Sequence, residues 1–240
     1  MIGTILNVAG ILIGGTVGLA RKRPLSAANE SFFKVTLGAF TVFYGLRLSW
    51  LSLKGPFLQV LKQLLIVVLA LILGRLAGRL LHLQKVSNQI GQGAREWIAS
   101  AQPDAARRTS DGFKICAALF CAAPLGIIGA LQDGLSGYFY PLAIKGVMEG
   151  LATMGFVWLF GWGTLLAALP VLALQGTITL LSAQFLEPFL NARGLLDSVN
   201  AVGGLLVFSV ALVILELKKI ELADYLPSLL FAPLITWVWR

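Results

Sequence analysis

The stretch of sequence that decides the fold is the first one, Ile2–Ala20, which reads IGTILNVAGILIGGTVGLA. It contains no charged residue, and a helix that crosses a membrane needs about 20 mostly apolar residues. Three basic residues follow it at positions 21–23. A cleavable signal peptide carries its positive charges before the apolar run. The sequence therefore predicts that this run is a retained first membrane span.

The composition of the whole chain supports a membrane protein. Of its 240 residues, 58% are hydrophobic and only 12% are charged, which is about half of the charged share in soluble domains. Such a chain is neither disordered nor a disulfide scaffold, since it has only two cysteines. We therefore expect an all-α fold, a polytopic transmembrane helical bundle of about 7–8 spans in a single membrane domain over residues 1–240.

The other expected spans are further apolar runs, separated by short polar segments. The eight runs are Ile2–Ala20, Phe32–Leu51, Phe57–Leu81, Gly112–Leu131, Pro141–Phe160, Gly163–Ala183, Leu195–Leu215 and Tyr225–Trp239. The polar segment 84–111 is expected to be a cytoplasmic loop. Basic residues concentrate after the first, third and seventh runs, which places these loops inside and the N-terminus outside. If there are seven spans, the side of the C-terminus changes.

A weak internal repeat relates the first three spans to the last three. It rests on five matches: Gly3-Thr4-Ile5 with Gly176-Thr177-Ile178, Gly38 with Gly203, Val42 with Val207, Phe43 with Phe208, and Leu69-Ala70 with Phe231-Ala232. An offset of five spans reverses orientation, so this pattern predicts an inverted repeat, as in many secondary transporters. The repeats would cover about 1–82 and 163–240, with central spans at 112–162. Chance similarity between apolar segments is the alternative.

The first candidate site is the pair Lys145 and Glu149, which lie one helical turn apart near the middle of the fifth span. An ionisable group inside the hydrocarbon is costly unless it is paired or faces water. Glu149 is therefore predicted to bind a cation or a proton, and Lys145 to occupy the site when no cation is bound. The alternative is a purely structural ion pair.

The second candidate group consists of polar residues on other spans. Gln132 and Asp133 lie in a glycine-rich segment after the fourth span, where Asp133 is expected to be an entry carboxylate near the outer surface. Gln175 and Thr177 follow Pro170 in the sixth span, and Asn7 is their counterpart in the first. We expect these neutral oxygens to complete the lining. An ordinary loop and polar helix packing are the alternatives.

Several negative expectations accompany these candidates. The sequence contains no metal-binding, phosphate-loop, nucleophile-elbow or dinucleotide motif, so we expect no metal, no cofactor, no nucleic-acid partner and no enzymatic activity. The expected partners are membrane lipids and a small solute or cation. Small-xxx-small steps at Gly10, Gly14 and Gly18 predict close helix packing, within the chain or in a homodimer.

Several ordered motifs together resemble one known family. They are Met-Ile-Gly-Thr-Ile-Leu-Asn at 1–7, Gly-Ala-Leu-Gln-Asp-Gly at 129–134, Gln-Gly-Thr-Ile-Thr-Leu-Leu at 175–181 and Val-Gly-Gly-Leu-Leu at 202–206. The chain is similar over nearly its whole length to the YdfK/YqgA-like integral membrane proteins, classed as domain of unknown function 554. The resemblance implies a multi-pass protein of the bacterial inner membrane. It implies no activity.

The sequence leaves two functions open. The first is a secondary transporter or channel that moves a small solute or ion, with cation or proton coupling. The alternative is a non-transporting membrane protein that acts as a scaffold, an assembly partner or a lipid-binding protein. If Asp133, Glu149, Asn7 and Gln175 converge on one site, the transport function is favoured.

Overall fold

The computed structural model describes residues 1–21, 25–99 and 105–239, and every regular element in these ranges is a helix. The elements are α1 (Ile2–Ala20), α2 (Ala27–Ser52), α3 (Phe57–Leu80), α4 (Leu83–Ala99), α5 (Ala105–Ala122), α6 (Pro124–Ser136), α7 (Tyr140–Phe160), the 3₁₀ turn η1 (Gly161–Ala167), α8 (Ala168–Leu181), the π-helical turn η2 (Ser182–Leu186), α9 (Glu187–Ala192), α10 (Leu196–Ile214), the 3₁₀ turn η3 (Leu222–Tyr225) and α11 (Ser228–Val238). Lys22 and Arg23 of the expected first inside loop lie outside the described residues.

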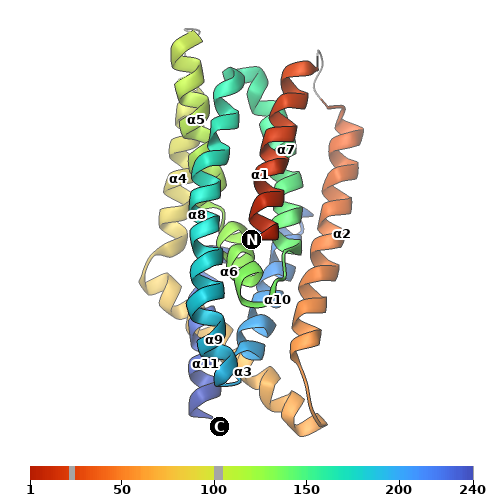
Figure 1. Ribbon diagram of the computed structural model, residues 1–240, viewed down its shortest axis with the longest axis vertical. Coiled ribbons are helices and arrows are strands. Elements are labelled where there is room, and N and C mark those ends of the chain that lie inside the picture. Colours follow the sequence, from red (N-terminus) through yellow and green to blue (C-terminus); the bar gives the residue numbers. More distant parts are fainter. Residues whose placement is uncertain (22–24, 100–104, 240) are drawn as a thin grey trace.

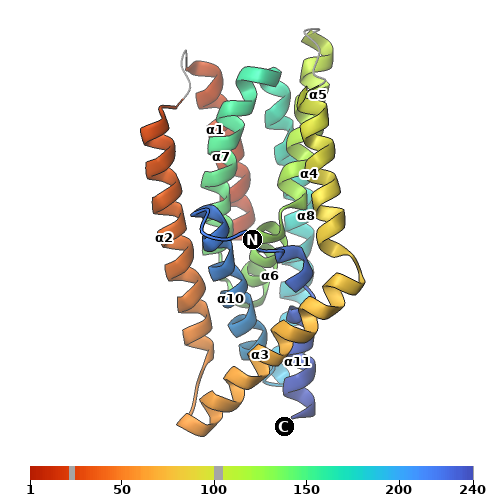
Figure 2. The same ribbon diagram turned by 180° about the vertical axis from the view of Figure 1, so that it is seen from behind.

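The molecule is elongated. Helices α1, α5 and α7 occupy its upper half and α3, α10 and α11 its lower half, whereas α2 and the α8–α9 run extend through both (Figures 1 and 2). The N-terminus lies near the middle of the long axis and the C-terminus at the lower end. Large apolar side chains such as Phe57, Leu58 and Val238 are about four-fifths exposed, as expected of helices that face lipid.

The expected number of spans is not confirmed. By length and hydropathy, four helical runs of the described chain can cross a membrane, and a fifth crossing is possible if α5 and α6 form one bent span. One of the four is the 53-residue run Tyr140–Ala192, which reverses direction at η1 so that α7 and α8 run in opposite directions (Figure 1). The first, third and seventh expected spans coincide with α1, α3 and α10 within a residue.

The polar segment 84–111, which was expected to be a loop, is mostly helical. It contains nearly all of α4 and the start of α5. Ala94 of α4 is fully buried and packs with Ile115 and Phe160, so the helix has one apolar face against the bundle. A helix with one apolar stripe and one polar face is typical of a surface position. The side chains at 99–107 are outside the described part of the segment.

The glycine steps of α1 determine the closest helix packing in the upper half. A Cβ atom on Gly10 would lie 2.2 Å from the carbonyl oxygen of Gly146, and one on Gly14 would lie 2.0 Å from that of Gly150. The backbones of α1 and α7 therefore touch. This ridge, which was expected to serve either internal packing or a homodimer, packs inside the chain, where it positions Asn7 over α7.

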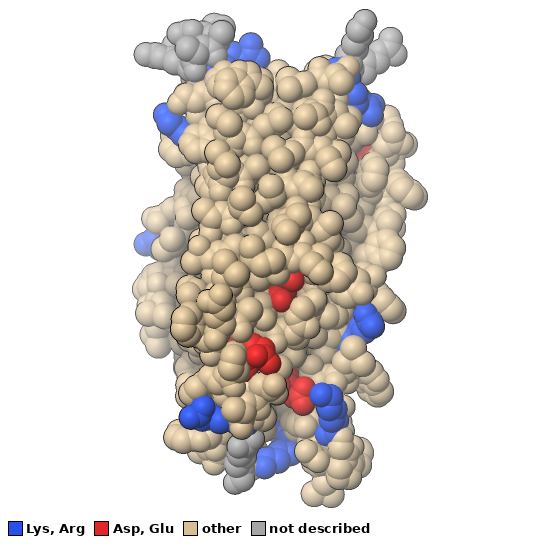
Figure 3. Space-filling view, viewed as in Figure 1, with Lys and Arg blue, Asp and Glu red and all other residues tan. Residues whose placement is uncertain are grey.

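Charged residues avoid a wide area of the surface. In Figure 3 most of them lie at the upper end and in the lower half, and the area between shows only one basic patch, at its left edge. At the lower end Lys54 pairs with Asp197, and Lys34 of α2 pairs with Glu216 just after α10. The separation of charged from uncharged surface is the pattern of a protein that contacts a bilayer.

Candidate functional site

The site begins at a break in the helix that was expected to be the fourth span. Proline has no backbone N–H, so Pro124 cannot donate to the carbonyl of Phe120 four residues earlier. The chain bends by 60° between Arg108–Ala122 and Pro124–Ser136. The freed carbonyl oxygen of Phe120 instead accepts a hydrogen bond from Lys145 Nζ at 3.1 Å. The break thus creates an acceptor for an ammonium group inside the protein.

Lys145 and Glu149 are nearly inaccessible, with 2% and 6% of their surfaces exposed. They lie four residues apart on α7, and Lys145 Nζ donates to Glu149 Oε1. The second carboxylate oxygen, Glu149 Oε2, is buried and has no hydrogen-bond partner among the described residues. A buried acceptor without a donor costs free energy of folding, and most buried polar atoms have a hydrogen-bond partner. Glu149 Oε2 is therefore the atom of the pair that a ligand could satisfy.

Two amide side chains complete the group. Asn7 of α1 donates through Nδ2 to Gln175 Oε1 of α8 at 2.9 Å, and its amide also faces the Glu149 carboxylate. Asn7 Oδ1 is buried without a partner in the described chain. A Cβ atom on Gly126 of α6 would lie 3.1 Å from Gln175. We call Asn7, Lys145, Glu149 and Gln175 the Lys145–Glu149 cluster, which α6 closes on one side.

Asp133 lies outside this cluster, beside the N-terminus of α1. Its Oδ2 atom accepts from the backbone N–H of Gly3 at 3.0 Å and forms an ion pair at 3.0 Å with the amino group of Met1. Between it and the cluster, the Thr4 and Thr179 hydroxyl groups are 3.2 Å apart, and Thr179 donates to the carbonyl of Ala130. Asp133 thus contacts α1 at Gly3, one helical turn before Asn7.

Two other predicted site residues do not join the cluster. Gln132 is fully buried on a different side of α6, against α10, where a Cβ atom on Gly203 would lie 2.0 Å from its Nε2 atom. Neither polar atom of its amide has a partner in the described structure. Thr177 is exposed on α8, whereas Thr179 points inward. Of the seven predicted residues, the structure therefore brings four together.

Sequence reasoning missed the Phe120 carbonyl, although the signal was present. A proline four residues after Phe120 is enough to identify an acceptor that the helix cannot use. The sequence analysis singled out Pro170, the proline before Gln175 and Thr177, instead. In the structure Pro170 lies in the first turn of α8, where a helical N–H has no intrahelical partner and proline is tolerated.

An aromatic group connects α2 to the turn that precedes α7. Tyr138 donates its hydroxyl to the carbonyl of Tyr44 at 2.7 Å, and the rings of Tyr44 and Tyr140 stack at 4.0 Å. Burial raises the pKa of Tyr138 to about 12, so its hydroxyl stays a donor at all physiological pH values. These contacts hold the start of α7 against α2.

The chemistry that the cluster offers is recognition of positive charge. Its unpartnered atoms are oxygens, Glu149 Oε2 and Asn7 Oδ1, and oxygen is the ligand that hard cations prefer. No group of three or more His, Cys, Asp or Glu side chains suitable for a metal ion occurs in the described ranges. One carboxylate with neutral amides suits a monovalent cation, a proton or an ammonium group.

Comparison with known proteins places the chain in a family. A family model described as "Protein of unknown function (DUF554)" matches residues 2–237. The chain belongs to this family. The membership confirms the resemblance that its ordered motifs indicated, because the match covers almost the whole chain.

Two curated relatives of the DUF554 family align over nearly their full length. The "Uncharacterized membrane protein YdfK" of Bacillus subtilis (strain 168) is 27% identical over 238 residues, covering 99% of this chain and 96% of the relative. The "Uncharacterized protein YqgA" of Escherichia coli (strain K12) is 28% identical over 242 residues, covering 100% and 97%. No solved structure matches significantly. The name of YdfK and the apolar helices together support membrane association of this family.

Proposed function

We propose that this DUF554 protein carries a small cation, or a solute bearing a proton or ammonium group, across the bacterial inner membrane. The observation that carries the proposal is the pair of buried oxygens that have no donor among the described residues, Glu149 Oε2 and Asn7 Oδ1, beside a buried ammonium group. Unpaired acceptors at this depth of a membrane protein are costly unless a ligand uses them.

In this proposal Lys145 is the internal competitor of the ligand. Its ammonium group neutralises Glu149 while the site is empty and keeps a second acceptor, the Phe120 carbonyl. An arriving cation binds the Glu149 carboxylate and the amide oxygens of Asn7 and Gln175. Lys145 then keeps only its hydrogen bond to the Phe120 carbonyl. The exchange keeps the net charge of the buried site small at each step, which limits the desolvation cost. Asp133, which contacts α1 one turn before Asn7, is the proposed entry carboxylate.

The inverted repeat remains part of the proposal, and the registers of the helix pairs support it. Gly74 packs against Ser228, and Gly78 packs against Asp224, which sets α3 antiparallel to α11 with Ala70 opposite Ala232. These two alanines are both fully buried and are the residues that the sequence repeat aligns.

The other two pairs cross in the same manner. Between α2 and α10, the contacts of Gly38 with Leu215 and of Ser49 with Ala201 are centred near Phe43 and Phe208. Between α1 and α8, Thr4 meets Thr179 close to the aligned triplets. A twofold axis in the membrane plane requires that counterparts meet on the axis. Superposition of residues 2–80 on 175–238 in an experimental structure, after a half-turn, tests the repeat.

Ligand-induced thermal stabilisation tests the cation site. The purified chain is heated with Li⁺, Na⁺, K⁺ or choline chloride at constant ionic strength, because a ligand that binds only the folded state raises the melting temperature. At least one of these ions should stabilise the wild-type protein. Glu149→Gln should abolish that stabilisation and remain folded, whereas Glu30→Gln, a change of the same chemistry at an exposed position of α2, should keep it.

Flux measurements distinguish transport from the alternative function. Proteoliposomes loaded with the stabilising ion should exchange it with labelled ion outside, and Glu149→Gln should reduce this exchange to the level of empty liposomes. An ion response without flux would favour the non-transporting scaffold. If neither an ion response nor flux occurs in the wild-type protein, the cluster is a structural ion pair and the proposal fails.

A further inference from the structure

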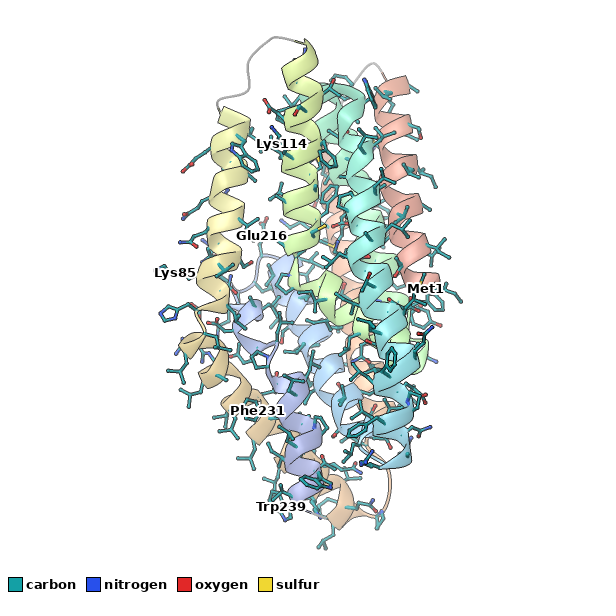
Figure 4. All side chains as sticks on the ribbon, turned by 60° about the vertical axis from the view of Figure 1, so that its left-hand side comes forward. Met1, Lys85, Lys114, Glu216, Phe231 and Trp239 are labelled. Atoms are coloured by element: carbon teal, nitrogen blue, oxygen red, sulfur yellow. The ribbon has the colours of Figure 1, made fainter. Side chains whose placement is uncertain are left out.

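A cavity that contains none of the residues of the Lys145–Glu149 cluster is rich in positive charge. It has a volume of about 1100 Å³ and lies among α3, α4, the second half of α10 and the segment that leads into η3. Figure 4 shows that Lys85 near the start of α4 and Glu216 just after α10 lie at a similar level of the molecule. Five basic side chains and one acidic side chain line the cavity: Arg75, Arg79, Arg95, Lys218, Lys219 and Glu221.

The single carboxylate is shared by two guanidinium groups. Arg75 and Arg79 lie one turn apart on α3, and their Nη2 atoms are 3.7 and 3.2 Å from the same oxygen of Glu221. The Arg75 guanidinium also lies over the ring of Tyr225, 5.5 Å from its centre. Two guanidinium groups that converge on one oxyanion form the geometry with which proteins bind phosphate or carboxylate groups.

The cavity also contains donors without acceptors. The Nε atom of Arg75 is buried and unpartnered in the described structure. Arg95, Lys218 and Lys219 form no ion pair with any described residue. The nearby Asp224 does not supply the missing negative charge, because its Oδ1 atom accepts from the backbone N–H of Gln84 and caps α4. The cavity therefore has more donors than the described part of the chain has acceptors for them.

We propose that this cavity binds a phosphate-bearing anion, with Arg75 and Arg79 gripping the phosphate and Arg95, Lys218 and Lys219 attracting it. Glu221 holds the two arginines when the anion is absent and competes with it. Aliphatic side chains form the remaining wall, among them Leu71, Leu205 and Val213. The ligand is therefore either the headgroup of an anionic phospholipid, whose acyl chain lies along this wall, or a free phosphate compound. The inference is independent of the cation site.

Isothermal titration of the full chain in maltoside micelles tests the proposal. The probes are inorganic phosphate, dihexanoyl phosphatidylglycerol and, as a zwitterionic control, dihexanoyl phosphatidylcholine. The wild-type protein should bind at least one of the two anionic probes in preference to the control, and more weakly as salt is raised. Tighter binding of phosphatidylglycerol identifies a lipid site, and tighter binding of phosphate identifies a site for a free anion.

Variants of the ion pair provide the decisive comparison. Arg79→Gln should weaken binding of the anionic probe by at least about tenfold. Arg79→Lys keeps the charge but loses the paired N–H donors of the guanidinium group, so its affinity should lie between those of Arg79→Gln and the wild type. Glu221→Gln removes the internal competitor and should strengthen binding, which a merely structural role of the pair would not produce. As a control, Lys54→Gln breaks an exposed ion pair just after the C-terminal end of α2. This variant should bind the anionic probe as tightly as the wild type does.

Three results would overturn the proposal. One is that neither anionic probe binds to the wild-type protein or to Glu221→Gln. Another is that Arg79→Gln, folded as judged by its melting temperature, keeps full affinity. The third is that Glu221→Gln binds the anionic probe no more tightly than the wild type.

Discussion

At the scale of single residues, Lys145 is the buried charge that links α7 to the break between α5 and α6. Its ammonium group has two acceptors, one on its own helix and one at the break between α5 and α6. A buried charge that loses its partner costs far more than a surface charge, because water cannot replace the partner. The sequence could identify Lys145 and Glu149 as a pair from their spacing. It could not identify the third member, because the Phe120 carbonyl belongs to a distant segment.

The first prediction concerns this pair. Lys145→Met leaves Glu149 buried without its counter-ion and should lower the stability of the fold by about 3–5 kcal/mol. The double variant Lys145→Met, Glu149→Leu should recover most of this loss, since both charges are gone. Thermal unfolding of the purified variants measures the difference. A double variant no more stable than Lys145→Met would contradict the explanation that the unpaired Glu149 charge causes the loss.

At the scale of helices, contact between backbones fixes which elements are neighbours. The parallel pair α1 and α7 is closest where glycine faces glycine, and α3 meets α11 at Gly74 and Gly78. The small-xxx-small steps were visible in the sequence, and they correctly indicated faces of close packing. The sequence did not reveal the partner of each face, because a glycine ridge records only the absence of side chains.

The second prediction tests this packing with a matched pair of variants. Gly14→Leu places a branched side chain where a Cβ atom alone would be 2.0 Å from a backbone oxygen, so α1 must separate from α7 and folding should fail or lose more than about 3 kcal/mol. Gly155→Leu on α7, where no atom lies within 4 Å of an added Cβ, should change stability little. Size-exclusion profiles and melting temperatures make the comparison. Equal behaviour of the two variants would contradict the α1–α7 contact.

At the scale of the whole molecule, the bundle is staggered along its long axis (Figure 2). Helices of similar length such as α1 and α10 lie at different levels. Hydropathy along a sequence records the length of each apolar run and says nothing about its level. For this reason the boundaries of several helices could be predicted, whereas the number of complete crossings could not. The same limit applies to the site, because Asp133 and Glu149 are both acidic and buried but only Glu149 joins the cluster.

The third prediction concerns orientation. The basic residues near α4 and those after α10 line one cavity, which agrees with the expectation that both segments face the cytoplasm. In a background without Cys116 and Cys121, a single cysteine at Gln92 of α4 should resist an impermeant thiol reagent added to intact cells. A single cysteine at Asn191, at the opposite end of the molecule, should be labelled. The reverse pattern would invert the topology.

The bend between α5 and α6 has a consequence for detection of the occupied state. One ammonium group bridges the bend and the carboxylate, so we expect the angle between the two helix segments to change when a cation binds Glu149. Amide protons of residues 125–128, at the start of α6, should therefore exchange with deuterium faster in Lys145→Met than in the wild type. In the wild type, their exchange rate should change when the stabilising cation is added. Mass spectrometry of this one peptide would then report whether the proposed cation occupies the site.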